Sequence, residues 1–325
     1  MSRRILAVAA AAVLLLAVPV ALDSFSVFVA SRILILGLFA TAYNVVFGYG
    51  GMPSLGHAAF FGIGGYTVGI AVTRWAWPMP LTMPVALVLG AVAGAVFGLF
   101  CLRVRGVYLL LITLALAQAV FGLAFYQTEL TGGDNGIPGI PRDGVPTGSG
   151  FYLLALAVTA GCVAALWAFQ RSPAGMTILG MRESESRMSA TGYQVATIRV
   201  MAFAVSGAFS AVAGALEVYL QGSVSTASLS WQISAEVLVF AILGGARRFL
   251  GPFLGAAIVT GLEVWVSTYT DRWTTVLGVV YILTALFLAD GVLGRSRSLL
   301  RRLRRGAAPP AEEAADESVI VEAGK

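Results

Sequence analysis

Long hydrophobic runs separated by short polar breaks dominate the sequence. A helix needs about 20 apolar residues to cross a bilayer core of roughly 30 Å, and about ten runs approach that length. The runs are continuous rather than alternating, which argues against a closed β-barrel in the membrane. The pattern therefore predicts an all-α fold: a polytopic helical bundle with about eight to ten transmembrane segments, including broken or short helices.

The expected spans follow the apolar runs: 1–22, 27–47, 55–72, 81–102, 107–125, 151–168, 200–220, 251–268 and 274–288. Run 1–22 is similar to a signal peptide, but an uncleaved first span is favoured because another span follows at once. Arg32 is expected to extend to the headgroups from the outer end of its span. Run 234–243 is too short to cross and predicts a half-helix or a short tilted span.

These spans place residues 1–293 in one transmembrane domain, with an external loop at about 126–150 and a cytoplasmic loop at about 171–199. Residues 294–325 form a basic and then acidic tail, for which we expect disorder. The 21 basic residues are Lys325 and 20 arginines, and 16 of those arginines fall at positions assigned to the cytoplasm. By the positive-inside rule, we expect both termini in the cytoplasm.

The stretch 171–199 carries the densest charge between hydrophobic runs. Ser172 before Pro173 is a helix-start signal, and Gly192 could close a second short helix that begins at about Glu183. Glu183 and Arg187 would form an acid-before-base pair on that helix. Two interpretations are open: a partner ATPase in the cytoplasm binds this stretch, or the stretch is an ordinary solvated loop.

Composition agrees with a membrane protein, since 58% of residues are hydrophobic and 11% are charged, against about a quarter charged in soluble domains. The two cysteines and the single histidine, His57, predict no disulfide framework and no metal site, and no cofactor is expected. There is no GxxxxGK[ST] phosphate loop, so the chain does not bind ATP in that manner. The basic run 295–305 predicts contact with anionic lipid rather than nucleic acid.

Glycine recurs through 48–70, around His57, and again at 244–255. Either the glycines let helices pack backbone to backbone, or the chain breaks there and lines a translocation pathway. The candidate pathway residues are Ser54, Gly56, His57, Gly64, Gly244 and Gly245. Four acids in or near the spans, Glu217, Glu236, Glu263 and Asp290, are scattered in sequence and form no relay, with Glu236 the most suggestive.

Five motifs, in order, carry a resemblance: SLGHAAFFGIGGY (54–66), RGVYLLLITLALAQ (105–118), LTGGDNGI (130–137), AFAVSGAFSAVAGAL (202–216) and LGGARRFLGPFLGAA (243–257). Together they resemble the branched-chain amino-acid ABC transporter permeases, in particular the LivM-type subunit, over about residues 30–292. The family's coupling loop, approximately AIRDNExxAAxxxG, falls on Arg182, Glu183, Glu185, Ala190 and Gly192. Glu183 replaces an aspartate, and Glu217 stands where the family is usually aromatic or apolar.

The resemblance implies a pore-forming subunit of a bacterial importer that carries branched-chain or similar small amino acids or amides. It also implies a second related permease, two cytoplasmic ATP-binding subunits and an external substrate-binding protein, so ATP hydrolysis would not occur in this chain. Two alternatives come from other classes. One is a self-contained ion-coupled transporter or channel, and the other is a membrane-embedded enzyme that uses His57.

Overall fold

A computed structural model describes residues 15–19, 21–246 and 248–270, with six further residues between 272 and 282. Most of the expected first span, much of the last span at 274–288 and the tail at 294–325 lie outside the described residues. Asp290 lies outside them as well.

Among the described residues, five helices are long and apolar enough to cross a membrane. They are α2 (Ser24–Asn44) with its π-helical continuation η1 (Val45–Tyr49), α4 (Met79–Phe100), α5 (Val107–Tyr126), α7 (Ser149–Arg171) and α10 (Val195–Gln221). Shorter helices complete the bundle: α3 (His57–Trp75), α11 (Trp231–Gly244) and α12 (Gly251–Ser267). A polytopic helical bundle is thereby confirmed.

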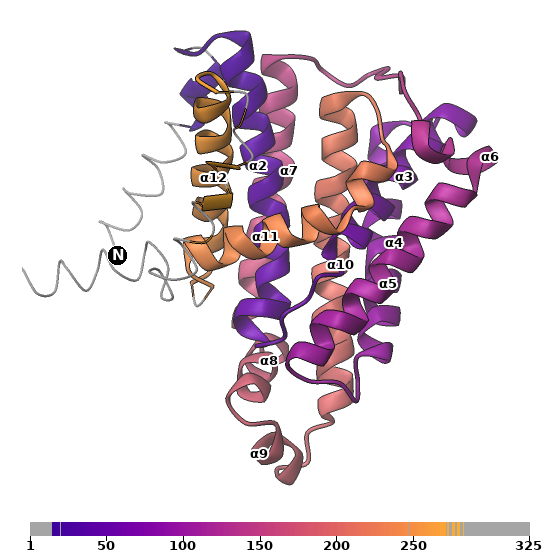
Figure 1. Cartoon of the computed structure of the whole chain (residues 1–325). Coiled ribbons are helices and arrows are strands. Elements are labelled where there is room, and N and C mark those ends of the chain that lie inside the picture. Colours follow the sequence, from indigo (N-terminus) through magenta and orange to yellow (C-terminus); the bar gives the residue numbers. More distant parts are fainter. Residues whose placement is uncertain are drawn as a thin grey trace, which may run out of the picture.

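The bundle has two distinct ends (Figure 1). At one, which we call the α9 end, helices α8 (Pro173–Glu183) and α9 (Glu185–Ala190) project beyond the long helices. At the other, which we call the α6 end, lie α6 (Thr128–Thr131) and the 3-10 helix η2 (Gly133–Asn135). Segment 126–150 is attached there to the loop after α10, because Ile137 and Val224 exchange backbone hydrogen bonds of 2.8 and 3.1 Å.

Helix α10 forms the centre of the bundle and packs chiefly against α4 and α3. Small residues allow this close approach: a methyl group on Gly64 would lie 1.9 Å from the carbonyl oxygen of Ala211 on α10. A methyl group on Gly90 of α4 would lie 2.5 Å from the carbonyl oxygen of Gly207. Glycines on neighbouring faces therefore let α3, α4 and α10 pack backbone to backbone.

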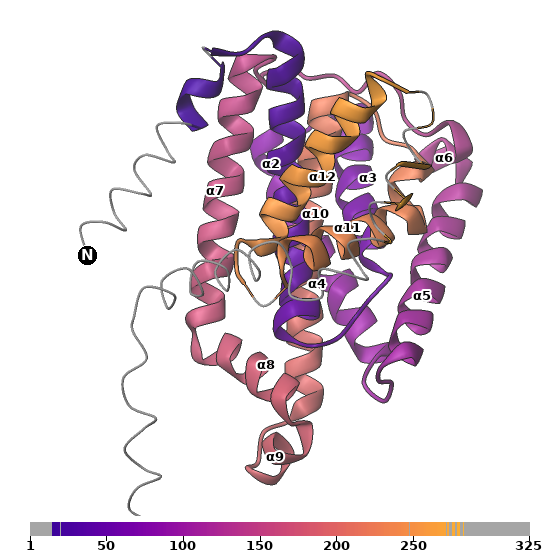
Figure 2. The same ribbon diagram turned by 60° about the vertical axis from the view of Figure 1, so that its left-hand side comes forward.

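Helix α11 runs across the long helices in two views separated by 60° (Figures 1 and 2). It ends at Gly244, and α12 then returns beside α2 toward the α6 end. The turn between them lies against the last α-helical turn of α2, where the Asn44 side-chain amide donates to the carbonyl oxygen of Arg248 at 3.2 Å. Run 234–243 is thus part of an oblique helix that is too short to cross a bilayer.

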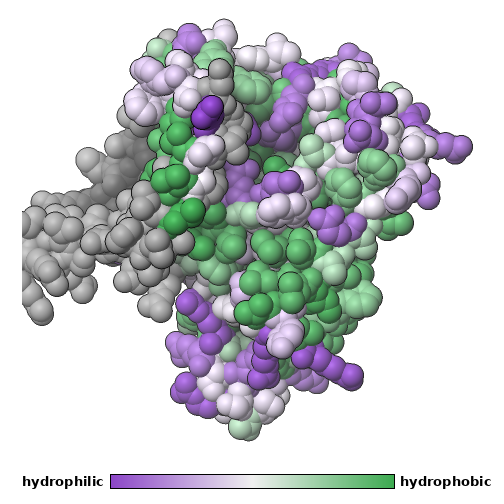
Figure 3. All heavy atoms as spheres, in the orientation of Figure 1, coloured by the Kyte–Doolittle hydropathy of each residue, from purple (hydrophilic) through white to green (hydrophobic). Residues whose placement is uncertain are grey.

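The face shown in Figure 3 is apolar at middle height and polar toward both ends. Only 28% of the most hydrophobic window of α4 and 22% of that of α5 is buried, against 61% for α2 and 56% for α10. Helices α2 and α10 therefore belong to the interior, whereas α4 and α5 present apolar faces outward. This distribution suits a bundle that contacts hydrocarbon at its sides and water at its ends.

Candidate functional site

The charged stretch at the α9 end folds into two short helices separated by a single residue. Ser172 caps α8, since its hydroxyl oxygen accepts from the backbone N–H of Gly175 at 3.3 Å. The hydroxyl oxygen of Ser184 accepts from the N–H of Arg187 at 3.3 Å and so starts α9. The second helix therefore begins at Glu185, two residues later than predicted.

The helix break changes the pairing predicted from sequence. Glu183 is the last residue of α8 and Arg187 lies in α9, so the expected intrahelical pair is wrong. Gly192 follows α9 with φ of +87°, a left-handed conformation that glycine adopts without strain. It is exposed, as are Glu183 and Ala190.

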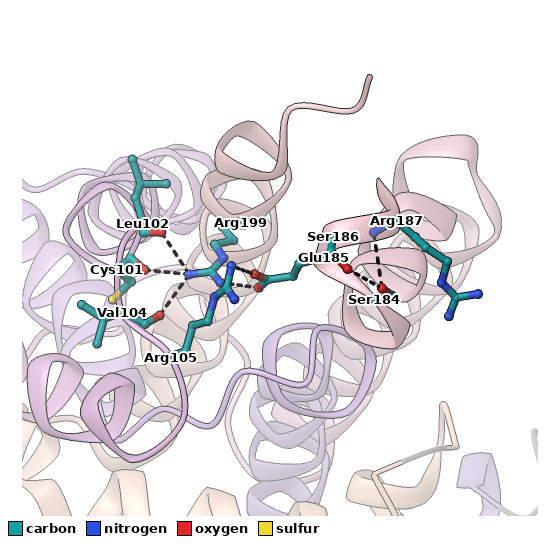
Figure 4. Close-up of polar contacts among 9 residues, drawn as sticks. All are labelled: Cys101, Leu102, Val104, Arg105, Ser184, Glu185, Ser186, Arg187 and Arg199. Atoms are coloured by element: carbon teal, nitrogen blue, oxygen red, sulfur yellow. Dashed lines mark hydrogen bonds and ion pairs between the residues drawn. The ribbon is translucent and has the colours of Figure 1, made fainter. Parts of the chain in front are cut away.

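Glu185 faces inward and joins two arginines (Figure 4). Its carboxylate pairs with Arg199 of α10 and with Arg105, which lies between α4 and α5. Arg199 is buried, with 3% of its side chain exposed, whereas 74% of the Arg105 side chain is exposed. The Arg199 pair is therefore the shielded and stronger of the two.

Arg199 also connects α9 to the end of α4. Its Nη1 donates to the carbonyl oxygens of Cys101, Leu102 and Val104 at 3.1, 3.1 and 3.0 Å (Figure 4). These carbonyls lie just beyond Phe100, the last residue of α4, near the negative end of the helix dipole. One guanidinium thus binds α10, α9 and the end of α4 together.

Arg182 makes a second anchor, on the end of α2. It donates to the carbonyl oxygen of Gly48 in η1. Its side chain also lies over Gly51, where a methyl group would come within 2.8 Å of the Arg182 Cγ. Between this anchor and that of Glu185 lies a cavity of about 340 Å³, whose lining includes Arg105, Arg182 and Glu185.

The structure divides the five predicted coupling residues into two groups. Arg182 and Glu185 point into the bundle, whereas Glu183, Ala190 and Gly192 face outward. Sequence reasoning did not single out Arg199 or Arg105 as members of this site. An arginine just inside the start of a long apolar helix, as Arg199 is, was the available signal.

His57, fully buried at the start of α3, is held by two serines. The Ser206 hydroxyl donates to the carbonyl of Ala42 at 2.7 Å, so its oxygen accepts from His57 Nε2 at 2.8 Å. The Ser54 oxygen accepts from the N–H of Gly56, and its hydroxyl can donate to His57 Nδ1 at 3.1 Å. Both ring nitrogens of a neutral imidazole are then satisfied, as expected of a structural histidine.

The other candidate pathway residues lie in close packing. A methyl group on Gly56 would meet Phe97 at 2.9 Å, and one on Gly244 would lie 1.8 Å from the carbonyl oxygen of Gly251. Gly245 has φ of +95° at the turn after α11. These contacts match the packing interpretation of the glycines, and a role in the pathway stays a prediction.

A third group of charged residues lies toward the α6 end. Its members were identified in the sequence, but not as neighbours of one another. Arg32 of α2 pairs with Glu263 of α12 at 3.6 Å and with Glu217 of α10 at 3.9 Å. Glu236 of α11 lies close enough for its charge to interact with all three. The expectation that Arg32 extends to the headgroups is wrong, because its guanidinium turns to these carboxylates. Acids scattered over three helices in sequence are thus neighbours in space.

The fold defines the chain as a polytopic membrane protein of helical-bundle type. Residues 25–288 match the family model described as "Branched-chain amino acid transport system / permease component". The chain belongs to this family of permeases of ATP-binding-cassette importers, which confirms the expected class.

Individual relatives extend this result. The chain is 29% identical over 324 residues to the high-affinity branched-chain amino acid transport system permease protein LivM of Escherichia coli K12, covering 91% of this chain and 76% of the relative. It is 28% identical to the autoinducer 2 import system permease protein LsrC of Enterobacter sp. strain 638, covering 75% and 71%. It is 26% identical to the ribose import permease protein RbsC of Haemophilus influenzae, covering 68% and 71%. No solved structure matches the chain significantly.

Proposed function

We propose that this permease forms one half of the membrane channel of an importer for branched-chain or similar small amino acids. The similarity to LivM over most of the chain supports this cargo, although relatives named for ribose and autoinducer 2 show that related permeases serve other molecules. The observation that carries the proposal is the double anchoring of the α8–α9 segment, by Arg182 to η1 and by Glu185 to Arg199.

The α9 end faces the cytoplasm in this proposal, as do both termini. The arginine distribution supports the orientation, since Arg103, Arg105 and four arginines of 171–199 lie in segments near this end. The assembly comprises a second related permease, two cytoplasmic ATP-binding subunits and an external substrate-binding protein. Those subunits supply the ATP hydrolysis for which this chain has no phosphate-binding loop.

Coupling divides between the outward and inward residues of the α8–α9 segment. The exposed Glu183, Ala190 and Gly192 contact the ATP-binding subunit. The inward Arg182 and Glu185 pass its movement to the ends of α2 and α4, because charge-assisted contacts hold those backbones to the segment. A rigid-body displacement of α9 would then move whole helices and expose the channel to alternate sides.

Reconstitution tests this proposal. The complete transporter in proteoliposomes should take up L-leucine at the expense of ATP. Glu185→Gln and Gly192→Val should each lower the leucine taken up per ATP hydrolysed by roughly fivefold or more, while membrane insertion is kept. Glu129→Gln is the matched control, since Glu129 is exposed at the α6 end. Unchanged uptake in both coupling variants would contradict the proposed coupling.

The two rival functions give different results. An ion-coupled transporter would accumulate leucine in liposomes that contain this chain alone. An enzyme or a strict proton relay using His57 would lose activity in His57→Gln, whereas the importer should keep it. The satisfied ring nitrogens of His57 favour the importer, because the imidazole has no free atom for proton transfer without breaking a bond to Ser54 or Ser206.

A further inference from the structure

Four helices bring one arginine and three glutamates together toward the α6 end. We call Arg32, Glu217, Glu236 and Glu263 the acidic cluster. Glu217 and Glu263 each lie four residues before the end of their helices, which corresponds to about 6 Å along the axis. The cluster therefore sits just inside the bundle rather than in open solvent.

The pairing within the cluster is incomplete. Glu217 is 8% exposed, and one of its oxygens accepts from Gln221 and faces Arg32. Its other oxygen, Oε2, is buried without a hydrogen-bond partner among the described residues. Glu236 makes no hydrogen bond or ion pair within the described part of the chain. A buried carboxylate oxygen without a donor is costly, so Glu217 Oε2 indicates a missing partner that donates hydrogen bonds.

Charge counting leads to the same conclusion. Three carboxyl groups lie around one guanidinium, so ionisation of all three would leave an excess of negative charge that a further cation could balance. The described residues contain no group of three acids, cysteines or histidines close enough to hold a metal ion. A cation that bonds to dispersed oxygens through several N–H donors fits better than a metal, which needs ligands within about 2.0–2.6 Å.

The surroundings suit a molecule that enters from the α6 end. In Figure 3, hydrophilic residues show in a hollow between α12 and the upper part of α10. Helix α11 crosses below this hollow (Figure 1) and contributes Glu236. A ligand moving inward through this hollow would therefore reach α11, the helix that carries Glu236.

We infer that the acidic cluster binds the ammonium group of the transported molecule, with the unpaired carboxylate oxygens of Glu217 and Glu236 as acceptors. This inference rests on the proposed function and adds a determinant of cargo chemistry to it. The ammonium is either the α-amino group of a neutral amino acid or the side-chain amine of a basic one.

A binding measurement tests the site without relying on transport. The purified complete transporter is heated with isopentylamine, which is leucine without its carboxylate, or with 4-methylpentanoate, which is leucine without its ammonium. Isopentylamine should raise the melting temperature of the wild type, because a ligand of the native state stabilises it by mass action, and 4-methylpentanoate should not. Glu236→Gln should remove the shift, whereas the control Glu129→Gln should keep it.

Uptake in proteoliposomes then separates the two sources of the ammonium. L-leucine uptake that falls about tenfold in Glu236→Gln, with L-lysine not carried, assigns the site to the α-amino group. Uptake of L-lysine that falls by the same factor assigns it to a side-chain amine.

Other outcomes overturn the inference or the proposed function separately. Equal shifts by both probes, or a Glu236→Gln variant that keeps the amine shift and normal uptake, would mean that the cluster is structural only. A Glu236→Gln transporter that is less stable than the wild type without ligand would also overturn the inference, because Glu236 would then have a partner within the protein. If the Glu236→Gln transporter fails to assemble, Glu236→Asp and Glu217→Gln replace it in the same measurements. Amine binding without amino-acid uptake would instead refute the proposed cargo and leave the site standing.

Discussion

Charged side chains gather near both ends of the bundle, but their charges balance differently. At the α9 end, one carboxylate, Glu185, serves two guanidiniums, and the buried Arg199 also binds three carbonyl oxygens at the end of α4. Toward the α6 end, one guanidinium faces three carboxylates, and a buried oxygen of Glu217 has no partner among the described residues. The first group has more guanidiniums than carboxylates and uses them on carbonyl oxygens, whereas the second has more carboxyl groups than guanidiniums and is suited to bind a cation.

The largest effect should come from removing the centre of the α9-end network. Arg199→Met leaves Glu185 and three carbonyls without their shared donor, so we expect a loss of about 3–5 kcal/mol in the free energy of unfolding. Denaturant or thermal unfolding of the purified protein in detergent measures it. Arg105→Met removes a mostly exposed partner of the same carboxylate and should cost about 1 kcal/mol or less. Equal losses would show that burial does not set the strength of this network.

Glu185→Gln should have a smaller effect in the same direction. The amide keeps an acceptor for Arg199 but removes the negative charge, so a loss of about 1.5–3 kcal/mol is expected. The exposed Glu183→Gln is the matched control and should change stability by less than about 0.5 kcal/mol. An effect of Glu183→Gln as large as that of Glu185→Gln would contradict the division into inward and outward residues.

His57→Gln tests the middle of the bundle, between the two charged groups. Gln can donate and accept hydrogen bonds, but it lacks the imidazole ring that bonds to both serines and packs edge-on against Tyr43, with ring centroids 4.6 Å apart. We therefore expect the free energy of unfolding to fall by about 1–2 kcal/mol. Leucine uptake per ATP should stay close to that of the wild type. Abolished uptake in a stably inserted variant would revive the catalytic or proton-relay alternatives.

The smallest effect should have the opposite sign. Glu236→Gln removes one carboxyl group from a cluster in which carboxyl groups outnumber guanidiniums. The free energy of unfolding of the protein without ligand should therefore rise by up to about 1 kcal/mol. The comparison of melting temperatures between Glu236→Gln and Glu185→Gln, measured side by side, tests the contrast between the two ends directly. A loss of stability in both would mean that the two networks are alike.

Much of this arrangement follows from local sequence signals, and the exceptions have physical causes. Ser172 before Pro173 located the start of α8, because capping depends on adjacent residues. The second break was missed because Ser184 lies between two glutamates and caps α9 within a run that reads as one helix. The position of α11 across the bundle and the meeting of Arg32 with Glu217 and Glu263 depend on residues more than 180 positions apart, which periodicity does not report.

Residue identity also left the role of glycine open. The same glycine-rich pattern predicts close helix packing and a broken, pathway-lining segment. In the structure Gly64 and Gly244 approach backbone atoms of neighbouring helices, which only the three-dimensional arrangement could show. Arg199 was similarly ambiguous, since an arginine at a span boundary can extend to lipid headgroups or turn to a buried partner.

Both charged groups share one helix, and this gives α10 the geometry of a lever. Glu217 follows Arg199 by 18 residues on α10, a rise of about 27 Å. A tilt of about 5° pivoting at Arg199 would carry the Glu217 carboxylate sideways by roughly 2 Å, close to the difference between a made and a broken hydrogen bond. A small tilt of α10 at Arg199 could therefore make or break the binding of a cation at Glu217. No chain of intermediate residues would be needed to connect the two positions.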